Sequence, residues 1–553
     1  MGGVGAVAAS LLLLAAIGYG VVAMGAVSPH GAAPSVHAQD VPVTLVPASS
    51  GLVPVKAIIN PPETQGSPNH KPNSNHAVHG NHLGRNGPIR ATLPSGPAQY
   101  GTGAGWDGID GFSSACLQPV YGMSDSPFAC LPPDVTVSAS PNFVMQEVNT
   151  AAEIWTTSGT FVKFFTLTNF YTAPSGAGCY LSDPQIYFDN TTQRWFSTIL
   201  SVTCGALNTQ QPNVASQIYL AVSQTSDPSQ GWFEYVVPNP LALNLADQPF
   251  IGMNDKVVVI SANQFPYQAL AVNAYTGAYF WVLDKLALEQ TGCTNPAGLL
   301  CSVSFQTFGP YPNLASIHPA HSYGPAPTEY MASVYPLSHG ETGVSTLNFF
   351  AVDGAPPTAT VTRTDFAIRP MNGPPFGDQP GMPASVETND GRISTGVYQA
   401  GITWWGANDG CTVAGSSQLR SCIRLFEIGT AGGTYSVVQD FDFNGGAAED
   451  DYFPGLTLDP AGDLAVTYAF SSASVYPSMA ATLRLASQTT AGLQAPTVVA
   501  AGLDTERGGR YGDYCDASPS YANPHEVWLA CEYILSYRNH VWNTHVQKLI
   551  VTA

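Results

Sequence analysis

The chain has 553 residues, of which 44% are apolar and only 10% are charged, whereas soluble domains are typically about 25% charged. Asp and Glu number 38 against 18 Lys and Arg, which gives a formal net charge of −20. This acidic balance excludes nucleic acid as a partner, because neutralising phosphates requires basic patches. The surface must instead be built from Ser, Thr, Asn, Gln, Gly and Tyr, which suits an extracellular protein.

The first 38 residues indicate export. Residues 4–27 include no charged side chain, and VHAQD offers a small-residue cleavage point after Ala38. The apolar run is also long enough to span a bilayer, and no Lys or Arg precedes it to fix an orientation. Residues 1–38 are therefore a cleaved signal peptide or an uncleaved membrane anchor. Both alternatives predict a secreted or cell-surface, extracytoplasmic location.

Residues 39–99 have the composition of a disordered linker. Pro, Asn, Gly and His are frequent, as in SPNHKPNSNHAVHGNHLGRNGP, and no hydrophobic period is present. His76, His79 and His82 are spaced by three and could hold a metal loosely, but a polar linker is the simpler interpretation. No metal site is predicted.

From residue 100 onward the sequence changes to short β-rich runs separated by Gly, Pro, Asn and Asp. Examples are QIYLAVSQT, KVVVISANQF and STLNFFAVDG. Helical periodicity is nearly absent, and evenly spaced strands with turn residues between them predict a sandwich, a barrel or a propeller.

An internal repeat favours the propeller. Similar units open at six positions: Asp134, Asp183, Asp247, Asp378, Asp451 and Asp513. The intervals are 49, 64, 131, 73 and 62 residues, so the long interval should contain one further unit, in which His321 takes the place of the Asp. In the second unit, DPQIYFDNTTQRWFSTIL and QIYLAVSQTSDPSQGWFEYVV each give two strands. Four antiparallel strands make one propeller blade.

Residues 100–553 are accordingly predicted to form an all-β propeller of seven four-stranded blades. Six units carry the Asp and the seventh is inferred from the spacing alone, so a count of six stays open. The last unit ends at THVQKLIVTA, one strand short. A strand from residues 100–131 is expected to complete it and close the ring.

The cysteines predict disulfides. An even number in neighbouring couples favours five short-range bridges formed outside the cytosol, and the absence of any C-x-x-C pair makes zinc a weaker interpretation. The couples are Cys116 and Cys130, Cys179 and Cys204, Cys293 and Cys301, Cys411 and Cys422, and Cys515 and Cys531.

Three stretches, PPDVTVSASPNFVMQEVN, DPQIYFDNTTQRWFS and RYGDYCDASPSYANPHEVW, resemble the sialidase-like group of secreted microbial β-propellers, a similarity that covers roughly Pro132 to the C-terminus. The resemblance implies a fold and export more than a chemistry. Sialidases usually carry Asp-box turns, S-x-D-x-G-x-T-W, and none occurs here. They also hold a substrate carboxylate with three arginines, a role that no motif assigns to the arginines available: Arg194, Arg392, Arg424, Arg507 and Arg510.

If each repeated Asp opens the innermost strand of its blade, the carboxylates ring one end of the central channel. They could latch blades together by accepting backbone N–H bonds, which a motif repeated in nearly every blade favours. They could instead hold Ca²⁺, a cationic ligand or a sugar. A pair of them could also cleave a glycosidic bond. The catalytic candidates are Asp183, Asp247, Asp378, Asp451 and Asp513.

Residues that break the pattern are the candidates for ligand binding. His318 and His321 replace the Asp in the fourth unit, and Arg510 stands just before Asp513. Neighbouring side chains cannot both face one side of a strand, so one tryptophan of the WW pair is expected to be exposed or to lie in the neighbouring groove. The ligand-binding candidates are His321, Trp404, Trp405, Arg510 and Tyr511.

The sequence therefore predicts an exported propeller that binds an extracellular ligand, carbohydrate or protein. The alternative is a carbohydrate-active enzyme, a sialidase-like glycoside hydrolase or lyase, with its site at the acidic mouth of the channel. No G-x-S-x-G, H-E-x-x-H, P-loop or dinucleotide motif occurs. No cofactor is expected other than Ca²⁺ in the acidic ring, and membrane contact is expected only through residues 1–38.

Overall fold

The computed structural model describes residues 42–62, 100–111, 132–173, 180–202, 216–266, 275–290, 302–414, 418–507, 510–535 and 542–552. The predicted signal peptide or anchor, residues 1–38, lies outside the described residues. So do six of the cysteines: Cys116, Cys130, Cys179, Cys204, Cys293 and Cys301. Within the described ranges, no helix is long and apolar enough to cross a membrane.

The strands form successive antiparallel groups of four, each named here by its first strand. The β4 group contains β4 (Thr136–Ala139), β5 (Phe143–Val148), β6 (Ala151–Thr156) and β7 (Phe161–Thr166). The β8 group contains β8 (Tyr180–Asp189), β9 (Arg194–Val202), β10 (Ser216–Ser223) and β11 (Trp232–Val237). The β12 group contains β12 (Asn244–Met253), β13 (Val257–Pro266), β14 (Gly277–Asp284) and β15 (Ser302–Tyr311).

The later groups repeat this order. The β16 group contains β16 (His318–Pro319), β18 (Thr328–Val334), β19 (Thr342–Asp353) and β20 (Thr360–Asn372). The β23 group contains β23 (Ile393–Gln399), β24 (Ile402–Thr412), β25 (Leu419–Gly429) and β26 (Ser436–Phe443). The β27 group contains β27 (Asp450–Leu458), β28 (Leu464–Ser472), β29 (Val475–Arg484) and β30 (Thr497–Ala500). Helices in the described residues are short: α2 (Leu167–Phe170), α3 (Lys285–Glu289) and the 3-10 turn η2 (Ala431–Gly433).

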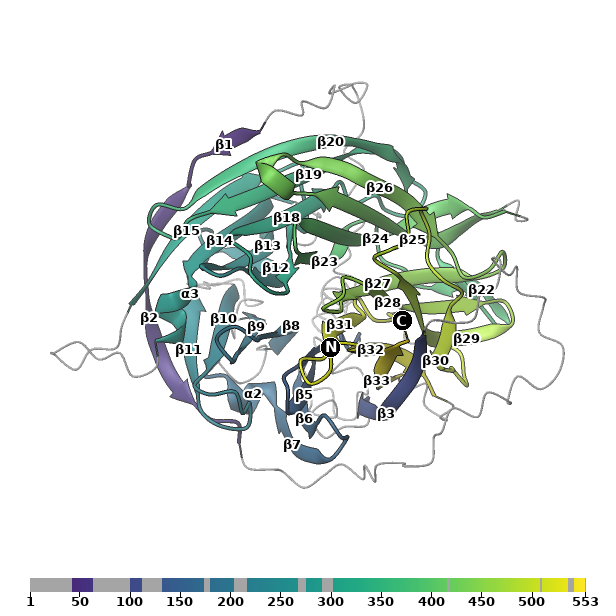
Figure 1. Cartoon of the computed structure of the whole chain (residues 1–553), viewed down its shortest axis with the longest axis horizontal. Helices are drawn as coiled ribbons and strands as arrows, with labels where there is room; N and C mark the ends of the chain where they lie inside the picture. The colour runs from purple at the N-terminus through teal and green to yellow at the C-terminus, as the bar shows by residue number, and fades with distance from the viewer. Residues whose placement is uncertain are drawn as a thin grey trace, which may run out of the picture.

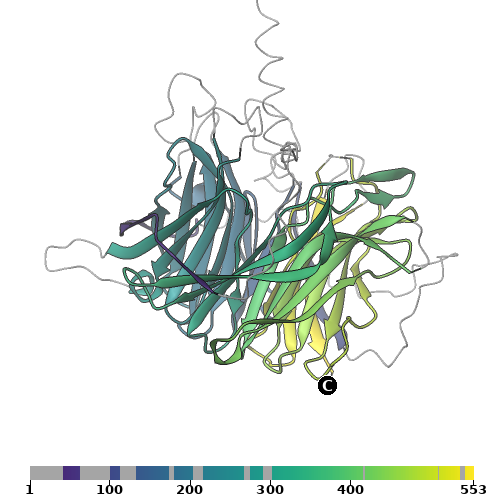
Figure 2. The same cartoon turned by 90° about the horizontal axis from the view of Figure 1, so that it is seen from above.

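The sheets lie around a common centre, with the first strand of each group innermost (Figure 1), and they stand beside one another in the side view (Figure 2). This is the arrangement of a β-propeller, and the predicted all-β class is confirmed. Because neighbouring sheets cover both faces of a sheet, strands such as β10 and β14 are buried along almost their whole length. The inner strand of the β16 group is interrupted, and its second piece, β17 (His321–Ser322), pairs in parallel with β12 and with β23.

The last group combines three strands from the C-terminal part of the chain with one strand that precedes the first group. It contains β31 (Asp516–Pro519), β32 (Glu526–Ile534), β33 (Trp542–Val551) and β3 (Tyr100–Asp110). In β3, Trp106 lies opposite Val546 of β33. The expectation that a strand from residues 100–131 would complete the last unit is confirmed. The ring of Trp106 also packs against Trp155 of β6 and Trp528 of β32, with centroids 5.4 and 5.2 Å apart, so β3 joins two neighbouring groups.

Side chains of several inner strands bind the backbone of the next inner strand. Thr136 Oγ1 and Ser138 Oγ in β4 accept hydrogen bonds from backbone N–H groups of β8, at 3.3 and 2.9 Å. In the same way Asp516 Oδ2 and Ser518 Oγ in β31 accept from β4, at 2.9 and 3.1 Å. Thr395 Oγ1 in β23 accepts from β27 at 3.2 Å. These contacts are the latch between neighbours, and most of them come from Thr and Ser.

Residues 42–62 form an edge strap around the outside, visible as the purple strands β1 (Val43–Leu45) and β2 (Ser49–Ile59) in Figure 1. The first half of β2 pairs with β15 and the second half with β11, while β1 pairs with β20. The strap thus covers the outer edges of three groups, edges that would otherwise present unpaired N–H and C=O groups. The prediction of an unstructured linker over 39–99 is therefore wrong for these residues.

The strap is held at few points. Val53 and Ile59 are 1% and 6% exposed, whereas Leu52 and Ile58 are 65% and 54% exposed. Lys56 Nζ donates to the backbone oxygen of Thr172 at 3.1 Å and lies 3.5 Å from Glu234 Oε1. Backbone pairing with two sheets, and not a wide apolar face, keeps the segment in place.

Two of the predicted disulfides fall in the described residues, and both are confirmed. Cys411 and Cys422 join β24 to β25 with Cα atoms 5.9 Å apart. Cys515, just before β31, is bonded to Cys531 in β32 with Cα atoms 4.4 Å apart. Each bridge ties two strands of one group, so the cysteines described here are architectural. The bonds also favour an oxidising, extracytoplasmic environment.

The strap can be tested with two neighbouring substitutions. Val53→Asp places a carboxylate at a buried position, which costs about 3 kcal/mol or more, whereas Leu52→Asp puts the same group in solvent. Hydrogen exchange should speed up in β11 and β15 for Val53→Asp only, because local opening exposes their backbone amides. Equal exchange in both variants would show that the strap does not protect these edges.

Candidate functional site

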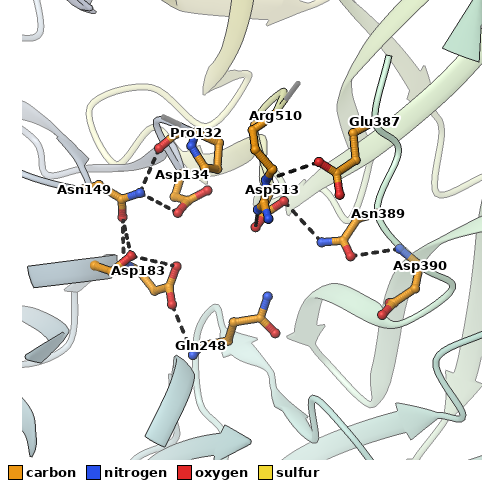
Figure 3. A network of polar contacts seen from close by, with 12 residues as sticks. Pro132, Asp134, Asn149, Asp183, Gln248, Glu387, Asn389, Asp390, Arg510 and Asp513 are labelled. Atoms are coloured by element: carbon orange, nitrogen blue, oxygen red, sulfur yellow. Dashed lines mark hydrogen bonds and ion pairs between the residues drawn. The ribbon is translucent and has the colours of Figure 1, made fainter. Parts of the chain in front are cut away.

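Carboxyl side chains gather around the central axis, at the end of the molecule where the inner strands begin (Figure 3). We call this set the carboxyl cluster: Asp134, Asp183, Asp247 and Asp513, with the guanidinium groups of Arg392 and Arg510 beside them. Asp134 precedes β4, Asp183 and Asp247 lie near the starts of β8 and β12, and Asp513 precedes β31. Four different groups therefore contribute one carboxyl each.

The cluster is built on a strained turn that recurs at the start of the inner strands. We call the residue with positive φ at this turn the head residue; the head residues are Asp134, Asp183, Gln248, Ser316 and Phe453, with φ between 49° and 57°. The strand register shifts at these heads in β8, β12 and β27. Asp tolerates the left-handed region better than most residues because its short side chain can bond locally.

Asparagine side chains fix several heads. The amide oxygens of Asn149, Asn263 and Asn408 accept hydrogen bonds from the backbone N–H groups of the heads in the following groups, at 2.7, 2.8 and 2.8 Å. The N–H donors are those of Asp183, Ser316 and Phe453, in that order. Because a buried backbone N–H must find a partner, this contact sets the position of each head.

Asn149 also ties two acids of the cluster together. Its Nδ2 donates to Asp134 Oδ2 at 2.6 Å, while its Oδ1 accepts from the backbone N–H of Asp183, as Figure 3 shows. Asp183 Oδ2 in turn accepts from the backbone N–H of Gln248 at 3.2 Å. Asp134 is 2% exposed and Asp183 is 6% exposed. Oδ1 of Asp134 is buried and receives no hydrogen bond from the described residues.

Asp134 and Asp183 titrate as a coupled pair. Burial raises the pKa of Asp134 well above its ordinary value, and the charges of Asp513 and Asp183 and a hydrogen bond to Asp183 raise it further. Burial also raises the pKa of Asp183, but the hydrogen bond to Asp134 and the donor at Gln248 oppose the shift. Two adjacent carboxyls cannot both ionise cheaply, so the pair favours holding one proton between them, and their mutual interaction favours the protonated form of Asp134 over that of Asp183.

The other two acids differ in their partners. Asp513 Oδ2 lies 2.7 Å from Arg510 Nη2, and Asn389 Nδ2 donates to its Oδ1 at 3.2 Å. Burial outweighs the attraction of Arg510 and raises the pKa of Asp513 to about 7. Asp247 is half-buried, and burial, reinforced by the charge of Asp183, raises its pKa to about 8.

Both arginines are already paired with carboxylates. Arg392 binds Asp390 through two nitrogens, at 2.7 and 2.5 Å, and also donates to the side-chain oxygen of Gln248. Arg510 Nε lies 3.2 Å from Glu387 Oε2, in addition to its contact with Asp513. Six carboxyl groups thus surround two guanidinium groups, and this surplus of negative charge adds to burial, the main cause, in raising the pKa values of Asp134, Asp247 and Asp513.

The repeated Asp residues do not form a ring. The β16 and β27 groups present Ser316 and Phe453 at the head position, so the four Asp residues of the cluster come from the β31, β4, β8 and β12 groups. Glu387 and Asp390, which precede β23, face them from the other side (Figure 3). The expected ring of Asp residues is wrong because the motifs are offset: Asp247 stands one residue before its head and Asp451 stands two before. A latch repeated in every group would place an Asp at each head, whereas only two of the five heads named above are Asp.

Two of the catalytic candidates lie elsewhere. Asp378 is in β21 (Gly377–Gln379), which pairs with β22 (Met382–Val386). Burial raises the pKa of Asp378, but a salt bridge of 2.8 Å to Arg420 and a donor at Ala384 outweigh it and leave the pKa below its ordinary value. Asp451 is fully buried and accepts from the backbone N–H of Gly445 at 2.5 Å. Neither side chain belongs to the carboxyl cluster.

Most of the ligand-binding candidates are buried. His321 is 8% exposed, its Nε2 lies 3.0 Å from the backbone oxygen of Ile251, and burial lowers its pKa to about 4. The hydroxyl of Tyr511, which is fully buried, donates to the backbone oxygen of Glu532 at 2.7 Å. Of the five candidates, only Arg510 lies in the carboxyl cluster.

The expectation that Trp404 or Trp405 is exposed is wrong, since they are 4% and 0% exposed. Neighbouring sheets cover both faces of β24, so residues pointing in opposite directions are both buried. Trp404 packs edge-on against Phe441 with centroids 6.4 Å apart, and Trp405 against Phe349 at 6.3 Å. Both side chains belong to the core.

Sequence reasoning missed part of the site. Asp134 was identified as the opening of a unit but was not among the catalytic candidates. Asn149, Glu387, Asp390 and Arg392 were not chosen because single polar residues in loops carry no pattern. The repeated Asn that follows or lies in the second strand of a group is the one signal that could have located the heads.

Comparisons with known proteins add similarity of shape only. No family model matches the chain, and no curated protein matches it. Among solved structures, Trypanosoma rangeli sialidase aligns over 71% of this chain and 56% of its own, at 8% identity and a TM-score of 0.31. This chain thus spans just over half of the trypanosomal sialidase.

Two further structures are similar over most of their own length. The α-L-arabinofuranosidase Arb93A of Fusarium graminearum aligns over 76% of this chain and 93% of its own, at 9% identity and a TM-score of 0.33. The intramolecular trans-sialidase of Ruminococcus gnavus aligns over 75% and 93%, at 11% identity and a TM-score of 0.33. These similarities assign no substrate and no catalytic residue to this chain.

The protonation of the cluster can be tested through the pH dependence of stability. Because the folded-state pKa of Asp247 is raised to about 8, its contribution to stability is complete below about pH 4 and is lost as the pH rises through 8. Asp247→Asn removes this titration. The thermal unfolding midpoint of wild type relative to Asp247→Asn should therefore fall between pH 5 and pH 8.5.

Asp378→Asn is the matched control, since the pKa of Asp378 is lowered and not raised. Wild type should not lose stability relative to this control over the same pH range. A constant difference between wild type and Asp247→Asn across the range would contradict a raised pKa at Asp247.

Proposed function

We propose that the chain is an exported, seven-bladed propeller that binds an extracellular ligand at the carboxyl cluster, through a positively charged group of that ligand. The observation that carries the proposal is the surplus of six carboxyls over two arginines at the mouth of the centre. A structural latch explains only part of it: Asp183 accepts from the backbone N–H of Gln248 in the next inner strand, but Asp513 binds the side chains of Arg510 and Asn389 instead.

The chemistry favours an ammonium or guanidinium group. Asp247 is half-buried, so its carboxyl oxygens are available to a ligand rich in N–H donors. An incoming cation would also relieve the repulsion that keeps protons on the acids. The described residues include no group of His, Cys, Asp or Glu arranged to hold a metal ion, which favours an organic cation over Ca²⁺.

Binding should tighten as the acids ionise. With probes such as spermidine and oligomers of glucosamine, affinity should increase from pH 5 to pH 7.5, because protons must leave Asp513 and Asp247 before their carboxylates can pair with the cation. Asp183→Asn should weaken binding at least tenfold, as expected for loss of a buried charge pair of about 2 kcal/mol. Isothermal titration in two buffers would measure both the affinity and the protons released.

Asp378→Asn, a surface carboxylate outside the cluster, should leave the affinity unchanged. Equal loss of affinity in Asp378→Asn and Asp183→Asn would mean that the net charge, and not the cluster, attracts the cation. Binding that is independent of pH would also overturn the proposal.

A second candidate function follows from the proton shared by Asp134 and Asp183. A protonated carboxyl beside an ionised one can protonate a leaving oxygen and later recover the proton. The two acids of glycosidases lie at least about 5 Å apart, so a hydrogen-bonded pair would act together as the proton donor. Asp247 or Asp513 would then accept the proton of the attacking water. This is the acid–base arrangement of a carbohydrate-active enzyme.

Turnover separates the two functions. Under the enzymatic alternative, a panel of aryl glycosides including an aryl sialoside should show release of the aryl alcohol, and Asp134→Asn should lower kcat by at least about 100-fold through loss of the general acid. Asp378→Asn should retain full activity. Absence of turnover across the panel, together with pH-dependent binding of cations, would leave the binding function alone.

A further inference from the structure

A second polar hollow lies at the opposite end of the inner strands. Its lining includes residues from three strand groups: Asp189 and Thr191 where β8 ends, Asn254 where β12 ends and Lys285 in α3 of the same group, and Tyr521 in the turn after β31. Asp189 stands six residues along β8 from Asp183, which is about 20 Å at 3.3 Å per residue. This turn-side pocket is therefore separate from the carboxyl cluster.

The floor of the pocket is formed by buried side chains that hydrogen bonds hold in place. Lys285 is 2% exposed, and its ammonium lies 2.5 Å from Asp189 Oδ2 and donates to the backbone oxygen of Asn254 at 2.9 Å. An ammonium has three N–H bonds, so these two contacts leave one donor. Asn254 is also 2% exposed, and its Nδ2 has no partner among the described residues. Its Oδ1 is fixed by the backbone N–H groups of Lys256 and Val257, at 2.8 Å each.

The charges of the pocket nearly cancel. Asp189 is neutralised by Lys285, and it also accepts from Thr191 N at 2.9 Å and Thr192 Oγ1 at 2.6 Å. Asp255, at the rim, is exposed and accepts from the backbone N–H of Ala326 at 3.0 Å. One uncompensated carboxylate at the rim disfavours anionic ligands, while the unused N–H groups of Lys285 and Asn254 need acceptor atoms, which an ammonium or guanidinium group does not offer. The pocket therefore suits a neutral molecule.

The polar groups alternate between donors and acceptors. Lys285 and Asn254 donate, Asp255 accepts, and Tyr521 adds an aromatic wall with a hydroxyl group. A hydroxyl both donates and accepts, so a molecule with several hydroxyls can satisfy all of these groups at once. The hollow is small, about 60 Å³, against about 300–1,000 Å³ for sites that enclose a drug-sized ligand, so it takes up one hydroxyl-bearing edge of a ring and leaves the rest of the ring at the rim.

We infer that the turn-side pocket binds a neutral polyhydroxylated ring of monosaccharide size. Lys285 and Asn254 donate to ring hydroxyl oxygens, Asp255 accepts from a hydroxyl at the rim, and Tyr521 packs against the C–H face of the ring. The inference does not rest on the proposed function of the carboxyl cluster, because no residue is common to the two sites.

Ligand-observed NMR on the full chain tests the inference, with methyl glycosides of glucose, galactose and mannose as probes. At least one should bind with a dissociation constant on the order of 1 mM, as expected for so few ligand atoms. Tyr521→Ala should weaken binding at least tenfold, and the exposed Asp255→Ala provides a second variant that does not disturb the buried floor. His525→Ala, in the same turn but outside the pocket, should bind as wild type does.

Asp183→Asn distinguishes the two sites. It should leave binding of the methyl glycosides unchanged even though it weakens binding at the carboxyl cluster. Loss of glycoside binding in Asp183→Asn with full binding in Tyr521→Ala and Asp255→Ala would overturn the inference. Failure of every neutral glycoside to bind, or tighter binding of glucuronate or glucosamine than of the neutral probes, would overturn it as well.

Discussion

Hydrogen bonds from the side chains of one inner strand to the backbone of the next hold the centre of this molecule together. Apart from β12 and β23, which pair with β17, each inner strand is the edge of its own sheet, so half of its backbone groups have no partner within the sheet. Thr136, Ser138, Asp516 and Ser518 provide that partner from the neighbouring group. Because buried N–H groups must be satisfied, these contacts fix the register between sheets, and the positions of the heads follow from it.

The heads explain how acids came to be buried at the mouth of the centre. A residue there must adopt positive φ, which Asp accepts more readily than most side chains, so carboxyls suit the backbone at Asp134 and Asp183 for local reasons. Burial then makes their ionisation costly, and the shared proton, Asn149 and the two arginines offset that cost. A local conformational requirement thus concentrates titratable groups at one place, where a ligand can meet them.

The class of fold could be predicted from the sequence because strands and turns leave local signals. The sequence of the second unit shows two hairpins directly. Because the last unit lacked its fourth strand, a strand from residues 100–131 could be predicted, and β3 is that strand. The edge strap could not be predicted, since β2 has exposed Leu52 and Ile58 beside buried Val53 and so lacks a clear alternation. The site was only partly predictable: the shift of two residues between motif and head left Asp451 outside the cluster, and partners such as Asn149 become neighbours only through the register between sheets.

The strap also constrains the order in which the chain can fold. Val43 pairs with Arg363 and Tyr100 pairs with Val551, so both N-terminal segments find their partners only after hundreds of later residues have been made. Contacts of such sequence separation form slowly, because the entropy of closing long loops is lost before the contacts form. During synthesis, residues 42–62 and 100–110 must therefore stay unpaired, and the outer edges of β11, β15 and β20 stay open until the strap docks. Conditions that slow this last step should favour pairing between chains over pairing within one.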